Sequence, residues 1–424
     1  MALLDRLLSG RIRNGTLTIV DPDGRRSAFG VSTPGWPDVV LNLQNRNASR
    51  RILLNPRLGL GEAFIDGSVT VDNDDIMGLV ELVRRNNPWE KGGEIGDPQP
   101  LKRAVKKMLR PFQQLNSLAN SKRNVAHHYD LSNDFYRLWL DEDMQYSCAY
   151  WPYAVTAGSG AAQSALSLDE AQLAKKAHIA AKLRLSPGQR VLDIGCGWGG
   201  MALYLSRVAD VEVLGITLSE EQLKLARERA EAAGVSDKVQ FELLDYRVLA
   251  AKAPGYFDRI ISVGMFEHVG VPQYETFFRA CANLLKDDGV MLLHTIGRMG
   301  KPGATDAFTR KYIFPGGYIP SLSETLAASE KVKLIASDIE TWRVHYALTL
   351  RQWYRRAFDS RAAIEAMMDP SFYRMWIFYL AGATAAFESG GMCNHQYQFV
   401  RDRRALQLNR DYMTEAERLY LAMG

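Results

Sequence analysis

Short apolar runs alternate with amphipathic segments along the middle of the chain, from about residue 168 to residue 294. The apolar runs and the segments of helical spacing predict strands at 191–195, 211–216, 239–243, 258–264 and 289–294, and helices at 168–183, 199–208, 219–233 and 272–285. Such alternation is typical of a doubly wound α/β sheet of parallel strands with right-handed crossovers. Ligands of these sheets bind beyond the carboxyl ends of the strands. The pattern therefore predicts one crevice built from distant segments.

The first 86 residues have a different pattern. Alternation over residues 16–20 predicts a strand, residues 21–24 read as a turn, and further β-like runs follow at 39–43, 51–54 and 63–71. Asp74 or Asp75 is placed to cap a helix whose apolar positions from Ile76 to Val83 share one face. We expect a small mixed α/β domain over residues 1–86. It carries no chemical motif, and a purely structural role stays open.

Residues 87–123 are predicted to form a linker, because prolines and glycines crowd its first part. Residues 101–110, LKRAVKKMLR, place apolar positions on one helix face and five Lys or Arg residues on its flanks. A helix of this kind can lie on an anionic lipid surface. A solvated surface helix explains the segment equally well. Residues 124–424 then form the predicted catalytic domain.

The pattern loosens after residue 294. Residues 297–317 are glycine-rich and predict a substrate-side loop, and helices are expected at 322–329, 349–367 and 371–387. Residues 395–400 are expected to return as an edge strand.

Composition narrows the class of protein. The apolar and charged fractions, 47% and 24%, are ordinary for a globular chain, and a net charge of +4 is too small to indicate nucleic acid. The four cysteines are widely spaced, which favours reduced thiols in a cytosol over disulfides or a metal site. Asp5 and Arg6 interrupt the apolar N-terminus, so no signal peptide is expected. The apolar run 375–387 is too short to span a bilayer. We expect a protein that is soluble or lies on a membrane surface.

The most informative stretch is VLDIGCGWGG, residues 191–200. Its glycines follow a predicted strand and precede a helix, the arrangement in which a backbone turn meets a ligand. The spacing formally matches the dinucleotide pattern G-x-G-x-x-G, but no acid ends the next strand to hold a ribose. Asp193 instead puts a negative charge just before the glycines. This favours the cationic cofactor S-adenosylmethionine (SAM) over NAD, and a turn without any ligand stays open.

Other polar residues fall at the ends of the predicted strands. They are Thr217, Asp245, Tyr246, residues 266–268 and His294. Together with Asp193 they are expected to surround the crevice.

A set of motifs resembles the cyclopropane-fatty-acyl-phospholipid synthases and the related mycolic acid cyclopropane and methyl transferases. The motifs are HYDLSNDFY (128–136), QYSCAYW (145–151), VLDIGCGWGG (191–200), GITLSEEQ (215–222), SVGMFEHVG (262–270), LLHTIG (292–297), IFPGG (313–317) and HYALTL (345–350). The resemblance implies a Rossmann-like class I methyltransferase sheet with helical insertions. The N-terminal segment resembles the extra domain of the phospholipid-acting enzymes, which implies a membrane phospholipid as substrate.

The resemblance also implies a reaction. These enzymes transfer the SAM methyl group to the cis double bond of an acyl chain, and a ring closes after proton loss to a bound bicarbonate. The implied holders of bicarbonate are Cys148, Glu267, His294, Tyr346 and the backbone of Ile296. His294 and Tyr346 would donate hydrogen bonds to the anion, and the proton would pass through His294 to Glu267. Cys148 would be a hydrogen-bonding group and no nucleophile.

For SAM, the resemblance implies four groups of residues. They are Tyr146 and Ser147 at the methionine end, the turn glycines Gly195, Gly197 and Gly199 beneath it, Thr217 with Gln222 at the ribose, and Asp245 with Tyr246 at the adenine. Asp193, which comes just before the turn, is expected to contact the cofactor as well. The mycolic acid enzymes carry the acid and the aromatic residue in the opposite order at the last pair, so the side-chain roles at 245 and 246 stay open.

Three rival functions remain open at this stage. A C-methyl or methylene transferase would share the site and differ only in the product. An NAD-dependent oxidoreductase is disfavoured by the missing ribose acid, and a non-catalytic lipid-binding protein by the intact set of Glu267, His294 and Tyr346. A cytoplasmic location at the inner face of the membrane is expected, no metal is expected, and a homodimer is left open.

Overall fold

The computed structural model describes residues 8–93, 131–155 and 163–424. The predicted basic segment 101–110 and the first residues of the motif at 128–136 therefore lie outside the described residues. The division of the chain at residues 86 and 123 stays a prediction.

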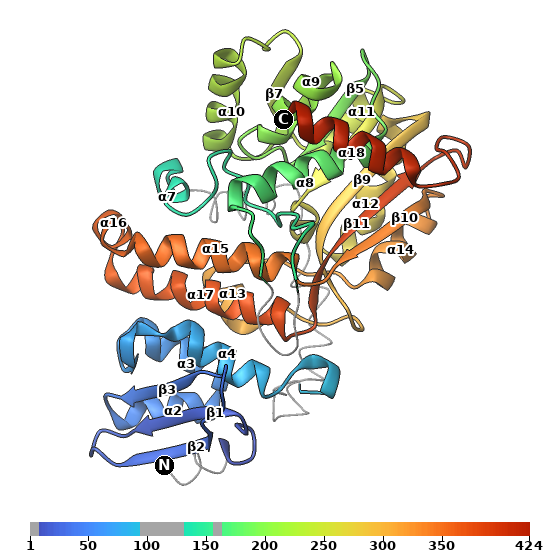
Figure 1. Cartoon of the computed structure of the whole chain (residues 1–424). Coiled ribbons are helices and arrows are strands. Elements are labelled where there is room, and N and C mark those ends of the chain that lie inside the picture. Colours follow the sequence, from blue (N-terminus) through green and yellow to red (C-terminus); the bar gives the residue numbers. More distant parts are fainter. Residues whose placement is uncertain (1–7, 94–130, 156–162) are drawn as a thin grey trace.

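The N-terminal part is a four-stranded sheet with helices on one side (Figure 1). Its elements are β1 (Gly15–Val20), β2 (Arg26–Val31), β3 (Asp38–Leu43), α2 (Arg46–Leu54), α3 (Pro56–Ile65), β4 (Val69–Val71), the 3₁₀ turn η1 (Asp72–Asp74), α4 (Ile76–Arg85) and the 3₁₀ turn η2 (Trp89–Lys91). The strand order is β2-β1-β3-β4, and β1 pairs parallel with β3 and antiparallel with β2. Every second residue of β1 is buried, as its alternation predicts.

Two of the predicted β-like runs in this part are wrong. Residues 51–54 end helix α2, and residues 63–65 end helix α3, so only Val69–Val71 of the last run is a strand. Asn45 caps α2 by accepting from the amide of Ala48, and Pro56 both ends α2 and begins α3. A short apolar run does not separate a strand from a helix end by periodicity, which explains the error. The cap predicted at Asp75 is confirmed, since its side chain accepts from Gly78.

The rest of the described chain contains a seven-stranded sheet of order β10-β11-β9-β8-β5-β6-β7. Its strands are β5 (Arg190–Ile194), β6 (Glu212–Thr217), β7 (Val239–Leu243), β8 (Phe257–Val263), β9 (Leu285–Arg298), β10 (Ile335–Trp342) and β11 (Met392–Val400). The strands β5 to β9 are parallel, and the chain reverses its direction of winding between β5 and β8. The expected doubly wound α/β fold is confirmed, and its ligand crevice is expected at this switch point.

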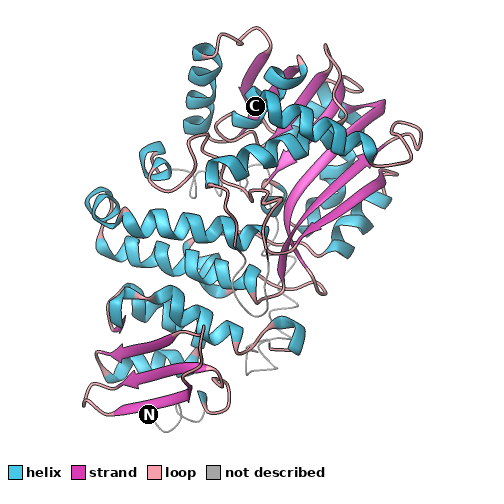
Figure 2. Cartoon of the chain, in the orientation of Figure 1, coloured by secondary structure: helices cyan, strands magenta, loops and turns pink. Residues whose placement is uncertain are grey.

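Helices cover both faces of the sheet (Figures 1 and 2). One face packs against α8 (Leu168–Leu183), α9 (Gly200–Ala209), α10 (Glu220–Ala232) and α18 (Asp411–Met423). The other face packs against α11 (Tyr246–Lys252), α12 (Tyr274–Leu284) and α14 (Leu322–Glu330), with the 3₁₀ turns η3 (Phe266–His268) and η4 (Val271–Gln273) ahead of α12. The short helix α7 (Asn133–Arg137) precedes this layer and is capped by Ser132.

The prediction of an edge strand at 395–400 is wrong. The strand β11 lies between β9 and β10, pairs antiparallel with both, and is almost fully buried. The sheet is therefore mixed, and β10, which the sequence pattern did not predict, is its edge on this side. Amides at 394, 396 and 398 gave the strand a polar face at period two, which is typical of exposure to solvent. Here that face is buried and hydrogen-bonded.

A helical pair joins the two sheets. The pair is α15 (His345–Asp359) and α17 (Pro370–Glu388), with α16 (Arg361–Met367) between them in sequence and α13 (Ala307–Tyr312) alongside. The predicted helix 349–367 is thus two helices, which separate at Ser360. Residues of the N-terminal sheet, α15 and α17 share one apolar core. Within the described residues, no helix is both long and apolar enough to cross a membrane.

Candidate active site

The glycine turn after β5 lies at the switch point of the sheet. Gly195 and Gly199 have φ values of 84° and 82°, a region that side chains other than glycine rarely adopt. A Cβ at Gly195 would come within 2.7 Å of Met265, and one at Gly199 within 2.6 Å of the Phe241 ring. The turn therefore needs glycine for its backbone and for close packing.

A cavity of about 140 Å³ lies above this turn. Almost all of the residues predicted to hold SAM line it: Tyr146, Ser147, Asp193, Gly195, Gly197, Thr217, Gln222, Asp245 and Tyr246. Gly199 does not line the cavity, since it is the N-cap of α9 and packs on Phe241. The structure thus brings together side chains from the ends of β5, β6, β7 and a loop that precedes the sheet.

Asp193 gives this cavity a buried acid. Its side chain is 1% exposed, and its Oδ2 atom has no hydrogen-bond partner among the described residues. Burial raises the pKa of this carboxyl to about 7, against a smaller lowering effect of nearby Lys175. A buried acid without a partner favours a cationic ligand, because a cation would stabilise the ionised form.

The polar residues farther along the cavity are paired. The Thr217 hydroxyl donates to Gln222 Oε1 at 2.9 Å, which orients the Gln222 amide with its oxygen toward Thr217. The Asp245 carboxylate forms a two-point ion pair with Arg247, with bonds of 2.8 and 2.7 Å. Arg247, which also lines the cavity, gave no signal in the sequence.

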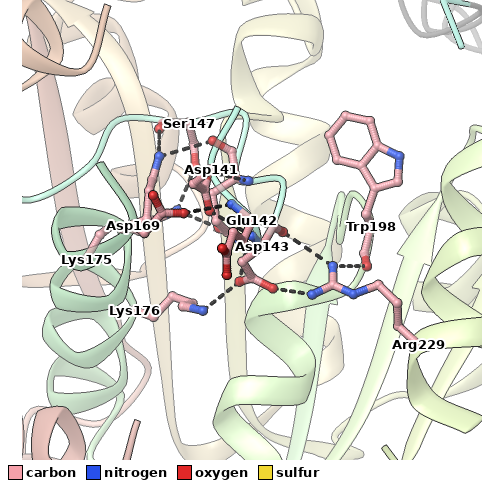
Figure 3. A network of polar contacts seen from close by, with 11 residues as sticks. Asp141, Glu142, Asp143, Ser147, Asp169, Lys175, Lys176, Trp198 and Arg229 are labelled. Carbon is pink, nitrogen blue, oxygen red and sulfur yellow. Dashed lines mark hydrogen bonds and ion pairs between the residues drawn. The ribbon is translucent and has the colours of Figure 1, made fainter. Parts of the chain in front are cut away.

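One loop, residues 141–148, forms a wall of the cavity and is held by helix α8 (Figure 3). The ammonium of Lys175 donates to Gln145 Oε1 at 2.6 Å and to Ser147 Oγ at 2.8 Å. The Gln172 amide donates to the carbonyls of residues 145 and 147 at 3.1 and 3.0 Å.

The far end of the same loop is held by charge. The carboxylate of Asp143 bonds Lys176 and Arg229, and Arg229 also donates to the Trp198 carbonyl in the glycine turn. These bonds tie the loop to α8, α10 and the turn at once. Because Lys175 is fully buried, its bonds to the loop are shielded from water.

A second, larger cavity of about 490 Å³ lies beyond this loop, and its lining is mainly apolar. All five residues predicted to hold bicarbonate line it: Cys148, Glu267, His294, Ile296 and Tyr346. Tyr146 and Ser147 line both cavities, so the loop is their shared wall. The large cavity continues between α13 and α17 to the N-terminal sheet, where Leu17, Leu41 and Leu79 line it.

Glu267 is the acid of the large cavity. Its Oε1 atom accepts from the amide of Ile296 at 2.6 Å, and its buried Oε2 atom has no hydrogen-bond partner among the described residues. Burial raises the pKa of this carboxyl to about 7. The Ile296 amide, expected to donate to a bound anion, is therefore already used by Glu267.

The thiol and the imidazole of this cavity are uncharged. Burial holds the pKa of Cys148 well above its ordinary value, which disfavours a thiolate nucleophile. Burial also holds the pKa of His294 well below its ordinary value. Both ring nitrogens of His294 lie within bonding distance of amides from β11, at 2.9 Å to Asn394 and 3.1 Å to Gln396.

Sequence reasoning missed these amides, because it took their strand for an exposed edge. It also missed Lys175, whose place on an otherwise ordinary helix gives no signal of burial. His268, which lines both cavities, was placed near the crevice but given no role.

Comparison with known proteins agrees with this geometry. The profile of the family described as mycolic acid cyclopropane synthetase matches residues 116–397. The chain is 37% identical to cyclopropane-fatty-acyl-phospholipid synthase of Escherichia coli K12, over 88% of this chain and 91% of that protein. It is 36% identical to a probable fatty acid methyltransferase of Pseudomonas putida, over 81% and 82%.

A solved structure with a related sequence shares the fold. The mycolic acid cyclopropane synthase CmaA1, complexed with SAH and CTAB, superposes with a TM-score of 0.60 at 32% identity, covering 66% of this chain and 97% of that one. The resemblance seen in the motifs is confirmed over most of the chain. This protein belongs to the mycolic acid cyclopropane synthetase family.

Proposed function

We propose that this protein transfers the methyl carbon of SAM to the cis double bond of an unsaturated acyl chain in a membrane phospholipid and closes a cyclopropane ring. The observation that supports this most is the shared wall of the two cavities. Tyr146 and Ser147 line a cavity with a buried acid on one side and a larger, mainly apolar cavity on the other. A sulfonium donor and an acyl chain would meet where the two cavities adjoin at these residues.

The small cavity suits SAM. Asp193 would face the cationic methionine end, and the Thr217–Gln222 pair would leave the Gln222 nitrogen to donate to a ribose hydroxyl. When bound, SAM supplies an electrophilic methyl group. Lys175, through Ser147, would fix the wall against which that methyl group lies, since an alkene is a weak nucleophile and needs close alignment.

The large cavity suits an acyl chain. Its volume of about 490 Å³ is within the usual range for small-molecule sites of about 300–1,000 Å³. Its apolar walls exclude water from the double bond, which protects a carbocation formed on the chain. At one end of the cavity, Glu267 and the two hydrogen-bond donors His294 and Tyr346 would lie where charge develops on the acyl chain.

The proton released on ring closure needs an acceptor. Glu267 Oε2 is buried at this end of the cavity, and its raised pKa makes the carboxylate a base suited to neutral pH. We propose that a bicarbonate anion, held by Cys148, His294 and Tyr346, lies beside it. Glu267 would then be the final acceptor of the proton.

The N-terminal part supports phospholipid as the substrate. The apolar cavity extends from Glu267 to the N-terminal sheet, which gives a long chain room to enter. The E. coli relative, which is named for a phospholipid substrate, aligns over 88% of this chain. We propose that the protein works at the inner face of the cytoplasmic membrane, and that a homodimer is compatible with this location.

Purified protein incubated with SAM and vesicles of monounsaturated phosphatidylethanolamine tests the function. The proposal expects a product heavier by one CH2 whose double bond is lost. The same gain of mass with a retained double bond would instead indicate transfer without ring closure, as a fatty acid methyltransferase like the P. putida relative could perform. No transfer to any lipid would refute both.

A further inference from the structure

Two buried amides of strand β11 bracket the ring of His294. Gln396 Nε2 lies 3.1 Å from His294 Nδ1, and Asn394 Nδ2 lies 2.9 Å from His294 Nε2. All three side chains are at most 1% exposed. The Trp342 ring, 5.1 Å away at an angle of 81°, packs on the imidazole edge-to-face. The imidazole is therefore fixed in place, and its hydrogen bonds define its chemical state.

The orientation of the Gln396 amide is set by Lys182 of helix α8. The Lys182 ammonium donates to Gln396 Oε1 at 2.7 Å, and Lys182 is itself paired with Glu340. An ammonium only donates, so the atom of Gln396 that faces it must be the oxygen. The nitrogen of Gln396 is thereby turned toward His294.

This orientation decides which ring nitrogen carries the hydrogen. The Gln396 NH2 group only donates, so Nδ1 of His294 must accept and cannot carry a hydrogen. A neutral imidazole then carries its hydrogen on Nε2, and burial keeps the ring neutral. The side chain of Asn394 must therefore accept this hydrogen through Oδ1. A 180° rotation of the Asn394 amide group exchanges Oδ1 and Nδ2 and puts the oxygen next to His294 Nε2.

We infer that Lys182 and Gln396 are positioning residues that hold His294 as the neutral tautomer with its hydrogen on Nε2, so that the ring presents a donor toward the substrate cavity. His294 and Asn394 both line that cavity, whereas Gln396 does not. The Nε2 edge is accordingly the one closer to a ligand. A bound anion can replace the Asn394 oxygen as the acceptor of this hydrogen.

The inference changes the role expected for His294. A proton relay through the ring would require Nδ1 to release a proton to a base, and Nδ1 faces the Gln396 nitrogen. His294 is thus a hydrogen-bond donor, and the proton reaches Glu267 by another route. This consequence for turnover rests on the proposed function, while the tautomer itself does not.

Long-range ¹H–¹⁵N NMR of the histidine side chains tests the tautomer directly in the full-length protein. The His294 signals are assigned by their loss in His294→Asn. We expect a protonated Nε2 and an unprotonated Nδ1 in the parent protein. In Gln396→Glu, the new carboxylate only accepts, so the hydrogen should move to Nδ1, and kcat should fall by about 10- to 100-fold, the range seen when the outer partner of a metal-bound histidine is lost.

Gln398→Glu is the matched control. Gln398 is a buried glutamine on the same strand face that bonds Tyr412 and the Lys182 carbonyl and does not touch His294. The control should leave the His294 tautomer unchanged. If Gln396→Glu does not fold, Gln396→Met removes the donor and should yield a mixture of tautomers. A parent protein whose His294 carries its hydrogen on Nδ1, or is charged at neutral pH, would overturn the inference.

Discussion

At the scale of single residues, two buried carboxyls are proposed to carry the chemistry. Asp193 and Glu267 each have one oxygen without a hydrogen-bond partner among the described residues, and each has its pKa raised to about 7 by burial. One faces the small cavity and the other the large one. A buried acid in this state costs stability unless a ligand meets it, which is why such groups mark functional sites.

Asp193 makes SAM binding depend on pH. A carboxyl with a raised pKa is neutral below pH 7, and a cation binds its ionised form, so SAM affinity should rise as the pH increases toward 7. The slope should approach about tenfold per pH unit below the pKa. Titration calorimetry from pH 5.5 to 8 measures it. Asp193→Asn should weaken binding and flatten the slope, while Asp210→Asn, an exposed acid at the far end of α9, should do neither. An unchanged slope in Asp193→Asn would contradict this role.

Glu267 should affect turnover and leave binding intact. In the proposed reaction its ionised form is the base, so kcat should rise with pH through about 7 and then level off. Glu267→Gln should lower kcat by about 10²- to 10⁴-fold, the usual contribution of a general base, and remove this rise. SAM affinity should stay nearly the same. Glu275→Gln, at an exposed acid, is the control. Loss of SAM binding in Glu267→Gln but not in the control would contradict the assignment of Glu267 to the large cavity.

At the scale of elements, helix α8 controls the wall between the cavities. Lys175→Met should remove both bonds to the wall, raise the KM for SAM and lower kcat, with a loss in kcat/KM of about 100-fold, as a misplacement of about 1 Å can cause. Lys176→Met is the matched control, because its partner Asp143 keeps its bond to Arg229. Steady-state kinetics compares the two. Equal losses in both variants would argue against a specific role for Lys175.

The elements also show what the sequence can predict. The apolar runs of β5 to β8 and the glycine turn have strong signals, so the parallel part of the sheet and the cofactor crevice could be predicted. Strand β11 could not be placed, because its alternating amides look like a solvent face when the elements that cover them are unknown. The burial of Lys175 and Lys182 could not be predicted for the same reason. Their partners lie on segments far apart in sequence.

The roles of site residues were harder to predict than their positions. The motif resemblance assigned five residues to one site, and in the structure all five line one cavity: Cys148, Glu267, His294, Ile296 and Tyr346. It could not show that Glu267 takes the amide of Ile296, since that bond depends on how η3 packs against β9. Hydrogen-bond partners are set by tertiary packing, which no single motif contains.

At the scale of the whole molecule, the N-terminal sheet and helix α17 complete the large cavity, the proposed site of the acyl chain. Gly382 in the middle of α17 lines it, and a Cβ at this position would meet no atom within 4 Å. The Cβ of Gly382→Leu should therefore fit without a clash, and its side chain should take up part of the cavity. Replacing a helical glycine should also stabilise the fold by up to about 1 kcal/mol.

This variant separates substrate binding from folding. We expect a higher KM for long-chain phospholipid, an unchanged SAM affinity and a melting temperature that does not fall. Gly382→Ala, with a smaller side chain, should show a weaker effect on KM. Kinetics with vesicles and a thermal melt measure these quantities. An unchanged lipid KM in Gly382→Leu would mean that the acyl chain lies elsewhere.

The most direct test of the central claim uses SAM whose methyl group carries three deuterium atoms, with vesicles of monounsaturated phosphatidylethanolamine. In the proposed reaction, the methyl carbon is transferred where the two cavities adjoin at Ser147 and loses one hydrogen, which Glu267 finally accepts, as the ring closes. The account predicts a lipid product that has lost its double bond and retains two of the three deuterium atoms. A product that retains all three, or label that never enters the acyl chain, would contradict it.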